Sequence, residues 1–392
     1  MDSSSSAAVV AGPLAGFVVA LRVDLQRCGY APSTIKKVIA TMARLSTWMQ
    51  RGDIAAGQLS PAVLETLPLR LRGTRPVVRF LRGCGAVPPA SCVDGAAPVD
   101  LVIAEFARWL VGERGLASVT VRCYRDRART FLQWLGEPLH EEVSSLDASE
   151  VTRFVLTYCP QVGCATAKVM VTALRALLRF LHVEGHVPRD LSGAVPAVAG
   201  WRQASLPRGL EAGQTQALLV ACDRRTTVGR RDYAVLMLLA QLGLRSAEVA
   251  ALELGDLDWH AGEVIIHGKA ARIDRLPLPV AAGEALADYL TQARPRCEST
   301  AVFITMCAPY EAISAHVVRQ AMYRACDRAG LARMGPHRLR HTLATDLLRA
   351  GGSLAEVGQI LRHRSALATS VYAKVDERSL SALVRTWPGG DR

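Results

Sequence analysis

The sequence predicts a mainly α-helical protein that contains one small antiparallel β-sheet. Half of the residues are hydrophobic but only 5% are aromatic. Leu, Val and Ala must therefore build most of the core, which favours helices over a β-sandwich. Segments with helical apolar spacing occur in both halves of the chain. Glu263–His267 and Arg275–Leu278 have the pattern of two strands that flank a turn at Gly268-Lys269.

The front half contains an imperfect repeat. Residues 29–49 and 115–135 each place a small or hydroxyl residue before a helical segment, and each has a Trp near its end. Residues 79–88 and 179–188 then share the pattern Arg-Phe-Leu followed by Gly-x-Val-Pro, in which Gly ends a helix and Pro prevents its continuation. Two matches in the same order predict a degenerate duplicated helical unit. Chance similarity between amphipathic helices is the alternative.

Two linkers divide the chain, which at 392 residues is too long for one ordinary core. Residues 89–98 are rich in Pro, Ala, Ser and Gly, and residues 192–207 carry few helix signals. We therefore expect three regions, at 1–90, 98–190 and 208–392.

The third region is expected to begin with helices at 211–220 and 231–242. Gly243 ends the second of these, and a new helix begins near Ser246. After the predicted hairpin, helices are expected from Gly283, Ser314, His337, Ser353 and Ser365.

The net charge of +12 indicates a polyanionic partner, with nucleic acid the first candidate and a solvated basic surface the alternative. The ten cysteines form no CxxC pair and no zinc-type spacing, a pattern typical of free thiols in a reducing compartment. The apolar residues 7–21 lack the basic start of a signal sequence. No apolar run is long enough to span a bilayer. We expect a cytoplasmic, nucleoid-associated protein.

Arg245 lies at a predicted helix start, just after Gly243 and Leu244. At such a position the backbone N–H groups and the positive end of the helix dipole also favour an anion. An arginine there can bind a phosphate through two parallel hydrogen bonds. Glu248 is placed to orient Arg245, although a surface ion pair is the simpler explanation of this motif taken alone.

His337 and Arg340 share one face of a predicted helix because they are three residues apart. His341 follows four residues after His337, a spacing that also occurs in metal-binding His pairs. Arg338 and Arg340 would repel a cation, and the carboxylate of an HExxH motif is missing. A cationic cluster with a titratable imidazole suits an anion instead. No metal and no other cofactor is therefore predicted.

His363 lies just beyond an apolar helical segment, and Tyr372 follows nine residues later. Alone, each would be an ordinary structural residue, a hydrogen-bonded His or a half-buried aromatic. Together with the earlier motifs, their order and spacing resemble the tyrosine recombinase (phage integrase) family over residues 208–380. Residues 98–190 resemble its helical core-binding domain more loosely. One departure is Arg362, where the family usually has Gly.

The resemblance implies a metal-free, ATP-free DNA recombinase that forms a 3′-phosphotyrosyl intermediate. The family's two catalytic Arg, hairpin Lys, two His and nucleophilic Tyr match Arg245, Arg340, Lys269, His337, His363 and Tyr372, and its structural acid matches Glu248. The arginines would stabilise charge on the phosphate, His337 would accept the phenol proton, Lys269 would protonate the leaving oxygen, and His363 would donate a hydrogen bond to the phosphate.

Double-stranded DNA is the implied partner, bound by a homotetramer on paired sites, with accessory or sibling recombinases as further partners. Arg122, Arg125, Arg127 and Arg129 form a basic stretch in which phosphate contacts are expected. Residues 1–90 are additional to the family's usual plan, and we expect them to contact DNA arms or another protomer. Integrase, transposase and resolvase roles stay open. The alternatives are a type IB-like topoisomerase and a catalytically silent architectural DNA-binding protein.

Overall fold

The computed structural model describes residues 10–59, 63–64, 67–68, 71, 73–87, 97–199, 209–268, 272–362, 369 and 372. Contacts between Cα atoms divide the chain into two compact units. One contains residues 1–59, 67–87 and 205–392, and the other contains residues 60–66 and 88–204. The N-terminal helices are thus grouped with the C-terminal region. The predicted division at 1–90, 98–190 and 208–392 therefore stays a prediction.

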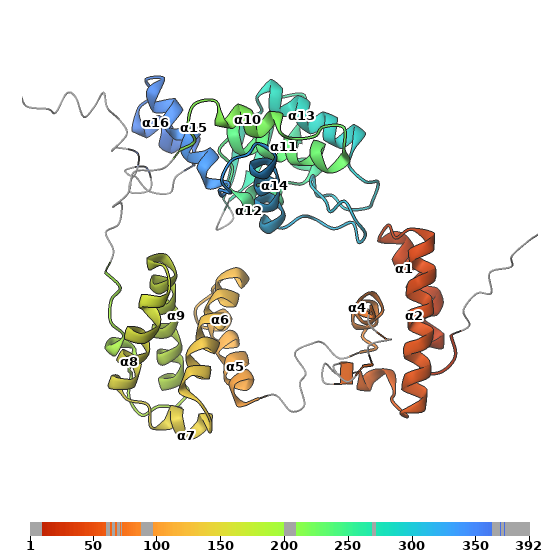
Figure 1. Ribbon diagram of the computed structural model, residues 1–392, viewed down its shortest axis with the longest axis vertical. Coiled ribbons are helices and arrows are strands. Elements are labelled where there is room, and N and C mark those ends of the chain that lie inside the picture. Colours follow the sequence, from red (N-terminus) through yellow and green to blue (C-terminus); the bar gives the residue numbers. More distant parts are fainter. Residues whose placement is uncertain are drawn as a thin grey trace, which may run out of the picture. The chain divides into compact units, whose positions relative to one another are not determined.

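The N-terminal segment is helical (Figure 1). The long helix α2 starts with a Pro at its first position, where the missing N–H costs nothing, and its buried residues recur at helical spacing. Leu21 and Leu25 of the preceding helix and Val77 and Leu81 of the following one are also buried. The elements are η1 (Ala15–Phe17), α1 (Val18–Arg27), α2 (Pro32–Arg51), η2 (Ala56–Gln58) and α4 (Arg75–Gly83).

The second unit is a helical bundle around an aromatic core. The rings of Phe106 and Phe180 lie 5.4 Å apart, and those of Phe131 and Phe154 lie 5.0 Å apart. All four side chains are essentially inaccessible to solvent, so they hold the first, second, fourth and fifth helices of the bundle together. The elements are α5 (Pro98–Gly112), α6 (Ser118–Leu135), α7 (Leu139–Ser144), α8 (Ala148–Tyr158), η4 (Cys159–Gln161), α9 (Cys164–Val183) and η5 (Ser192–Ala194).

The helix ends of the predicted repeat have the same geometry. Gly85 follows α4 with φ of 73°, and Gly185 follows α9 with φ of 77°, values that glycine adopts without the usual steric penalty. After each glycine, the next two amides both donate to one earlier carbonyl, that of Leu81 at 2.9 and 3.2 Å and that of Leu181 at 2.8 and 3.2 Å. This matched geometry supports the prediction of a duplicated unit.

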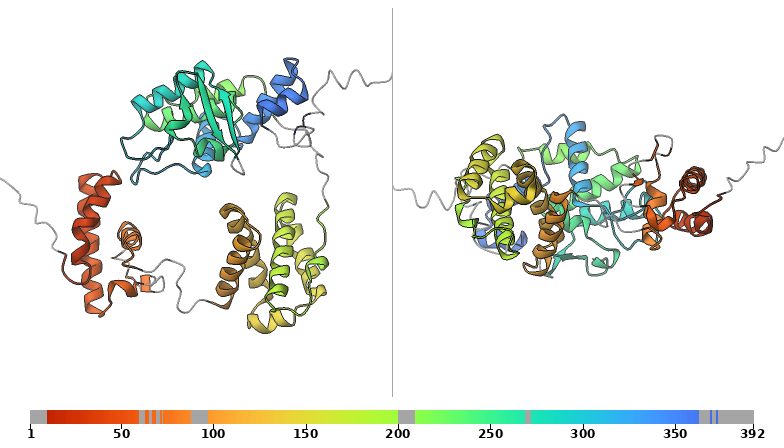
Figure 2. Two further views of the ribbon diagram at one scale, coloured as in Figure 1. Left: turned by 180° about the vertical axis from the view of Figure 1, so that it is seen from behind. Right: turned by 90° about the horizontal axis from the view of Figure 1, so that it is seen from below.

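The C-terminal region combines helices with a three-stranded antiparallel sheet, visible in the left view of Figure 2. Its order is β1-β2-β3, and Ile265 of β2 pairs with Arg275 of β3. Val264 and Ile266 are fully buried, so this face of the sheet joins the helical core. The elements are α10 (Gln214–Val220), α11 (Thr227–Gln241), α12 (Ser246–Ala250), η6 (Leu254–Asp256), β1 (Leu257–Asp258), β2 (Glu263–His267), β3 (Ile273–Pro277), α13 (Val280–Gln292), α14 (Ala315–Arg328), α15 (His337–Arg349) and α16 (Leu354–Ile360).

These elements confirm the predicted fold class, with some differences in element bounds. The helix expected from residue 231 begins at Thr227, because the Thr226 side chain caps it by accepting a hydrogen bond from Gly229 N at 3.0 Å. The helix expected from Gly283 begins at Val280. The helix expected from Ser365 lies outside the described residues.

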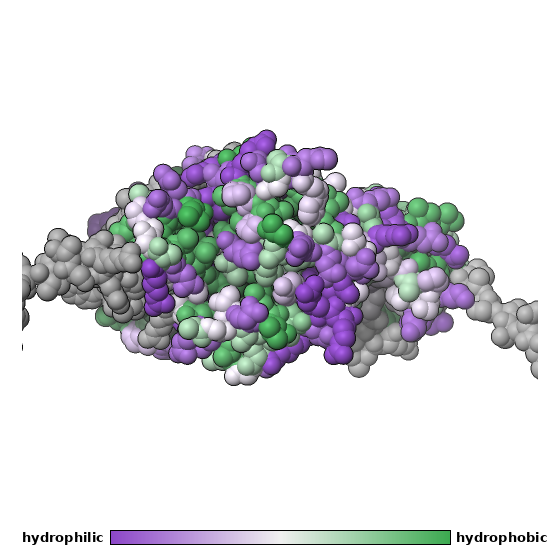
Figure 3. Space-filling model, turned by 90° about the horizontal axis from the view of Figure 1, so that it is seen from above, coloured by the Kyte–Doolittle hydropathy of each residue, from purple (hydrophilic) through white to green (hydrophobic). Residues whose placement is uncertain are grey.

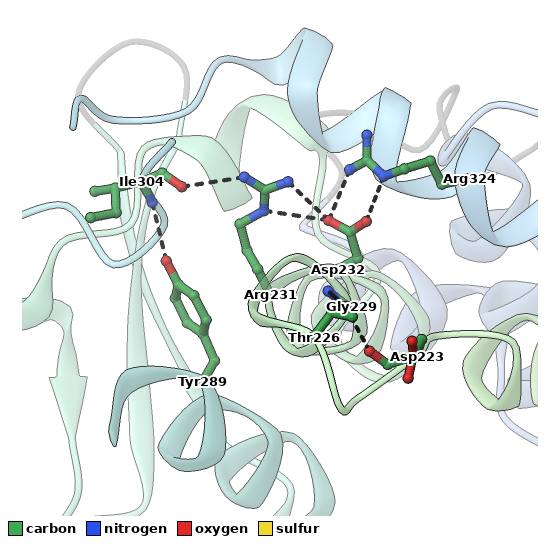
Figure 4. A network of polar contacts seen from close by, with 8 residues as sticks. All are labelled: Asp223, Thr226, Gly229, Arg231, Asp232, Tyr289, Ile304 and Arg324. Carbon is green, nitrogen blue, oxygen red and sulfur yellow. Dashed lines mark hydrogen bonds and ion pairs between the residues drawn. The ribbon is translucent and has the colours of Figure 1, made fainter. Parts of the chain in front are cut away.

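A buried ion-pair network ties α11 to α14 (Figure 4). Asp232, whose side chain is 1% exposed, accepts hydrogen bonds from Nε and Nη2 of Arg324 at 2.7 and 2.9 Å. The adjacent Arg231 donates to the same carboxylate at 3.1 Å and also contacts the carbonyl of Ile304 at 3.4 Å. The Asp232 carboxylate therefore holds α11 and α14 together. The next helices along the chain, α12 and α15, carry the site described below.

The surface is mixed in character. Figure 3 shows hydrophilic residues interrupted by small apolar patches on one face. The exposed large apolar side chains are spread over several helices. None of the helices among the described residues combines the length and apolar character that crossing a membrane requires.

Candidate active site

Arg245 is held at the start of α12 by Glu248. The carboxylate of Glu248 accepts a hydrogen bond from the Arg245 backbone N at 2.8 Å and one from its Nη1 at 2.7 Å. Glu248 is buried, whereas the Arg245 side chain is 41% exposed. Glu248 thus contacts both the backbone and the side chain of Arg245, and the exposed guanidinium keeps N–H groups open to an incoming anion.

Arg340 lies one turn into α15 and is almost fully buried. Its Nη1 and Nη2 donate to the backbone carbonyls of Gly243 and Leu361. Burial lowers the pKa of Arg340 to about 10, and the neighbouring Arg245 and Arg362 act in the same direction. The buried charge of Arg340 is therefore well suited to stabilise a phosphate. A bound phosphate would relieve the repulsion between Arg340 and the two neighbouring arginines.

Tyr372 is buried, at 2% exposure, against apolar side chains of α15 and α16. Its hydroxyl lies 2.7 Å from Nδ1 of His341. Burial raises the pKa of the Tyr372 phenol, while Arg340 partly offsets this. Burial also lowers the pKa of His341, and His337 and Arg340 lower it further. A neutral His341 is therefore favoured, and a neutral imidazole can accept the phenol proton.

His337 lies one turn before His341 on α15, and the two rings are 6.5 Å apart. Partial burial lowers the pKa of His337, and Arg340 and Arg245 lower it further, whereas Glu248 acts in the opposite direction. The charges of Arg245 and Arg340 thus act on His337, as expected for three groups around a common anion site.

Two predicted site residues, Lys269 and His363, lie outside the described residues. Within the described ranges, no group of three or more His, Cys, Asp or Glu side chains is arranged to hold a metal ion.

The predicted DNA-contacting arginines lie on α6. Arg122 and Arg125 are exposed. Arg129 is less available, because its Nη1 lies 2.6 Å from Oδ1 of Asp100 on α5. Arg122, Arg125 and Arg129 are spaced to share one face of the helix.

Comparison with known proteins identifies the family that has this set of site residues. Residues 208–379 match the model of the phage integrase family, and residues 103–185 match that of the phage integrase N-terminal SAM-like domain. A protein of Sinorhizobium fredii (strain NBRC 101917 / NGR234) that carries an integrase/recombinase name, y4rA, is 35% identical over 96% of this chain and 95% of its own length. The tyrosine recombinase XerD of Mycobacterium tuberculosis (strain ATCC 25618 / H37Rv) is 31% identical over 71% of this chain and 93% of its own length.

The chain is a tyrosine recombinase of the phage integrase family.

Solved structures of the family have the same fold. XerH bound to its palindromic difH substrate matches with a TM-score of 0.56, covering 74% of this chain and 97% of the other at 18% identity. A λ integrase tetramer bound to a Holliday junction matches with a TM-score of 0.54, covering 83% and 90% at 18% identity.

The contact between His341 and Tyr372 is not among the expectations drawn from the sequence. There, His341 enters only as half of a metal pair, and His337 is the expected base. The signal was present, since His341 immediately follows Arg340 and shares a helix face with His337. That assignment for His337 stays a prediction.

Proposed function

We propose that this recombinase cleaves and rejoins DNA at specific sites through a 3′-phosphotyrosyl bond to Tyr372, without metal or ATP. The observation that carries the proposal is the convergence of α12, α15 and Tyr372. They bring together two arginines, two imidazoles and a phenol whose hydroxyl is 2.7 Å from His341. These groups match the needs of phosphoryl transfer.

The arginines serve the transition state. When a phenol oxygen attacks a phosphodiester, negative charge builds up on the non-bridging oxygens. Arg245 and Arg340 supply permanent positive charge and planar N–H donors for those oxygens. Because Arg340 is anchored to backbone carbonyls, it would be pre-organised before DNA binds.

The phenol oxygen of Tyr372 forms a bond to phosphorus, and its proton passes to an imidazole, His337 by the family resemblance or His341 by the observed contact. The bond from phosphorus to the 5′-oxygen breaks, and that oxygen takes a proton from Lys269, while His363 donates a hydrogen bond to the phosphate. Attack by a 5′-hydroxyl of another duplex then reverses both transfers, so no external energy source is needed.

Double-stranded DNA is the proposed partner, and a homotetramer on paired sites is the proposed assembly. The net charge of +12 supports DNA binding. Support for the assembly comes from structural neighbours, one of which is a λ integrase tetramer on a Holliday junction. An integrase or transposase role is proposed, since one neighbour is the integrase of transposon Tn1549 in complex with circular intermediate DNA. Sibling recombinases are proposed as further partners.

The test is covalent capture. The full chain is incubated with a library of nicked suicide duplexes that have a randomised centre, and adducts that survive SDS are isolated and sequenced. We expect adducts with the wild-type chain and none with Tyr372→Phe, which keeps the ring but lacks the nucleophile. Adducts formed by Tyr372→Phe would show that another residue attacks, and no adducts with the wild-type chain would contradict the proposed cleavage.

Two further readouts separate the alternatives. Adduct formation should persist in excess EDTA, whereas loss restored by Mg²⁺ would point to a metal-dependent nuclease. A selected duplex should be joined to a second duplex. Relaxation of supercoiled plasmid without any joining would favour the topoisomerase alternative.

A further inference from the structure

Arg362 has an unusual backbone conformation. It follows the end of α16 with φ of 54°, a left-handed value found in one other non-glycine residue of the described chain. Glycine adopts this conformation without steric cost, which agrees with the Gly that the family usually has at this place. A strained residue persists only where its surroundings hold it in place.

The side chain of Arg362 explains why it is held there. It is 3% exposed, and its Nη2 lies 2.7 Å from Oε2 of Glu248. Its Nε is 3.9 Å from Asp274 on β3, while its Nη1 is buried without a hydrogen-bond partner in the described part of the chain. An isolated buried guanidinium is costly, so the contact with Glu248 is the main compensation.

Glu248 is therefore shared between two arginines. One of its oxygens accepts from Arg245 Nη1, and the other accepts from Arg245 N and Arg362 Nη2. Burial acts to raise the pKa of Glu248, but the Arg245 N–H and the Arg362 charge outweigh it and lower that pKa. With glycine at 362, Arg245 and Glu248 would form a neutral pair. With arginine, the trio carries one net positive charge.

We propose that Arg362 is a positioning residue of the active site. It fixes Glu248, and through it Arg245, and it adds a positive charge behind the phosphate-binding groups. This inference rests on the proposed DNA cleavage. The Arg362 side chain acts through Glu248, and its backbone N is bonded to the carbonyl group of Leu361 that Arg340 binds.

The test compares three variants of the full chain on a duplex selected by wild-type covalent capture. Arg362→Gly restores the usual residue and removes the backbone strain. Arg362→Lys and Arg362→Gln keep an unbranched polar side chain under the same strain, with and without charge. For each we would measure the single-turnover rate of adduct formation at saturating protein, the DNA affinity and the thermal unfolding temperature.

We expect Arg362→Gly and Arg362→Gln to slow adduct formation about 10- to 100-fold, the range for removing a partner that orients a direct ligand. DNA affinity should change little, and Arg362→Lys should restore part of the rate. A merely structural role predicts rates that follow the unfolding temperatures rather than the charge. If Arg362→Gly does not fold, the comparison of adduct-formation rates between Arg362→Lys and Arg362→Gln tests the inference.

Equal rates for wild type, Lys and Gln variants, or rates that track unfolding temperature alone, would overturn the inference. Those results would leave the proposed function intact, because the wild-type chain would still form adducts. Absence of wild-type adducts would instead reject the proposed function.

Discussion

The buried carboxylate of Asp232 offers a quantitative test of what holds the site's helices together. In the Asp232→Asn variant, the amide oxygen can keep the contacts of Oδ1, but an NH₂ group would replace Oδ2 and face the Arg324 Nε donor 2.7 Å away. Arg231, 6% exposed, and Arg324, 33% exposed, would also lose their counter-charge. Breaking a buried ion pair in this way costs about 3–5 kcal/mol.

For a folding unit of this size, 1 kcal/mol corresponds to roughly 2–4 °C in unfolding temperature, so the expected fall is on the order of 10 °C. Differential scanning calorimetry of the full chain measures it. Asp327→Asn is the matched control, since Asp327 also binds an arginine, Arg333, through two hydrogen bonds at 2.8 Å, but at the surface. That variant should change little. Equal shifts for the two variants would refute the view that burial makes the Asp232 network important.

Three further outcomes are expected. His341→Ala should slow adduct formation about 100-fold or more, as loss of a general base does. The control His316→Ala, on the exposed face of α14, should leave the rate unchanged. Equal rates for the two variants would exclude His341 from the reaction. Because burial and neighbouring cations lower the pKa of His337 and His341 in the folded chain, the unfolded chain binds more protons. The free energy of unfolding should then decrease as pH falls below about 6.5, and urea titrations at several pH values would reveal a flat profile if this is wrong. Replacing Arg122 and Arg125 together by Ala should reduce the slope of log affinity against log salt by about 1–2, and an unchanged slope would place the DNA elsewhere.

Local spacing made the arrangement on α15 predictable. His337 and Arg340 lie on one turn, and their relation depends on helix geometry alone. The contact between Arg245 and Glu248 could be predicted in the same way. A residue at a helix start and one three positions later contact each other in a standard capping arrangement.

Contacts between residues far apart in the chain could not be predicted from local spacing. Arg362 and Glu248 are 114 positions apart, and the positive φ of Arg362 contradicts the local preference of arginine. The strand β1 is only two residues long, too short for an alternating pattern to appear. The early start of α11 was signalled by the cap at Thr226, although its apolar periodicity begins later.

The anchoring of Arg340 has a consequence for how this protein can vary. Its two partners are main-chain oxygens of Gly243 and Leu361, and every amino acid carries such an oxygen. The side chains at the partner positions thus need no polar group to bind the guanidinium. Position 243 is restricted instead by its positive φ of 57° and by the nearby Leu361 and Leu343 side chains. A lost arginine, by contrast, has no second-site remedy, because no exchange of a partner's side chain can recreate the missing fork. Lineages that diverge widely around this turn should still keep the arginine itself.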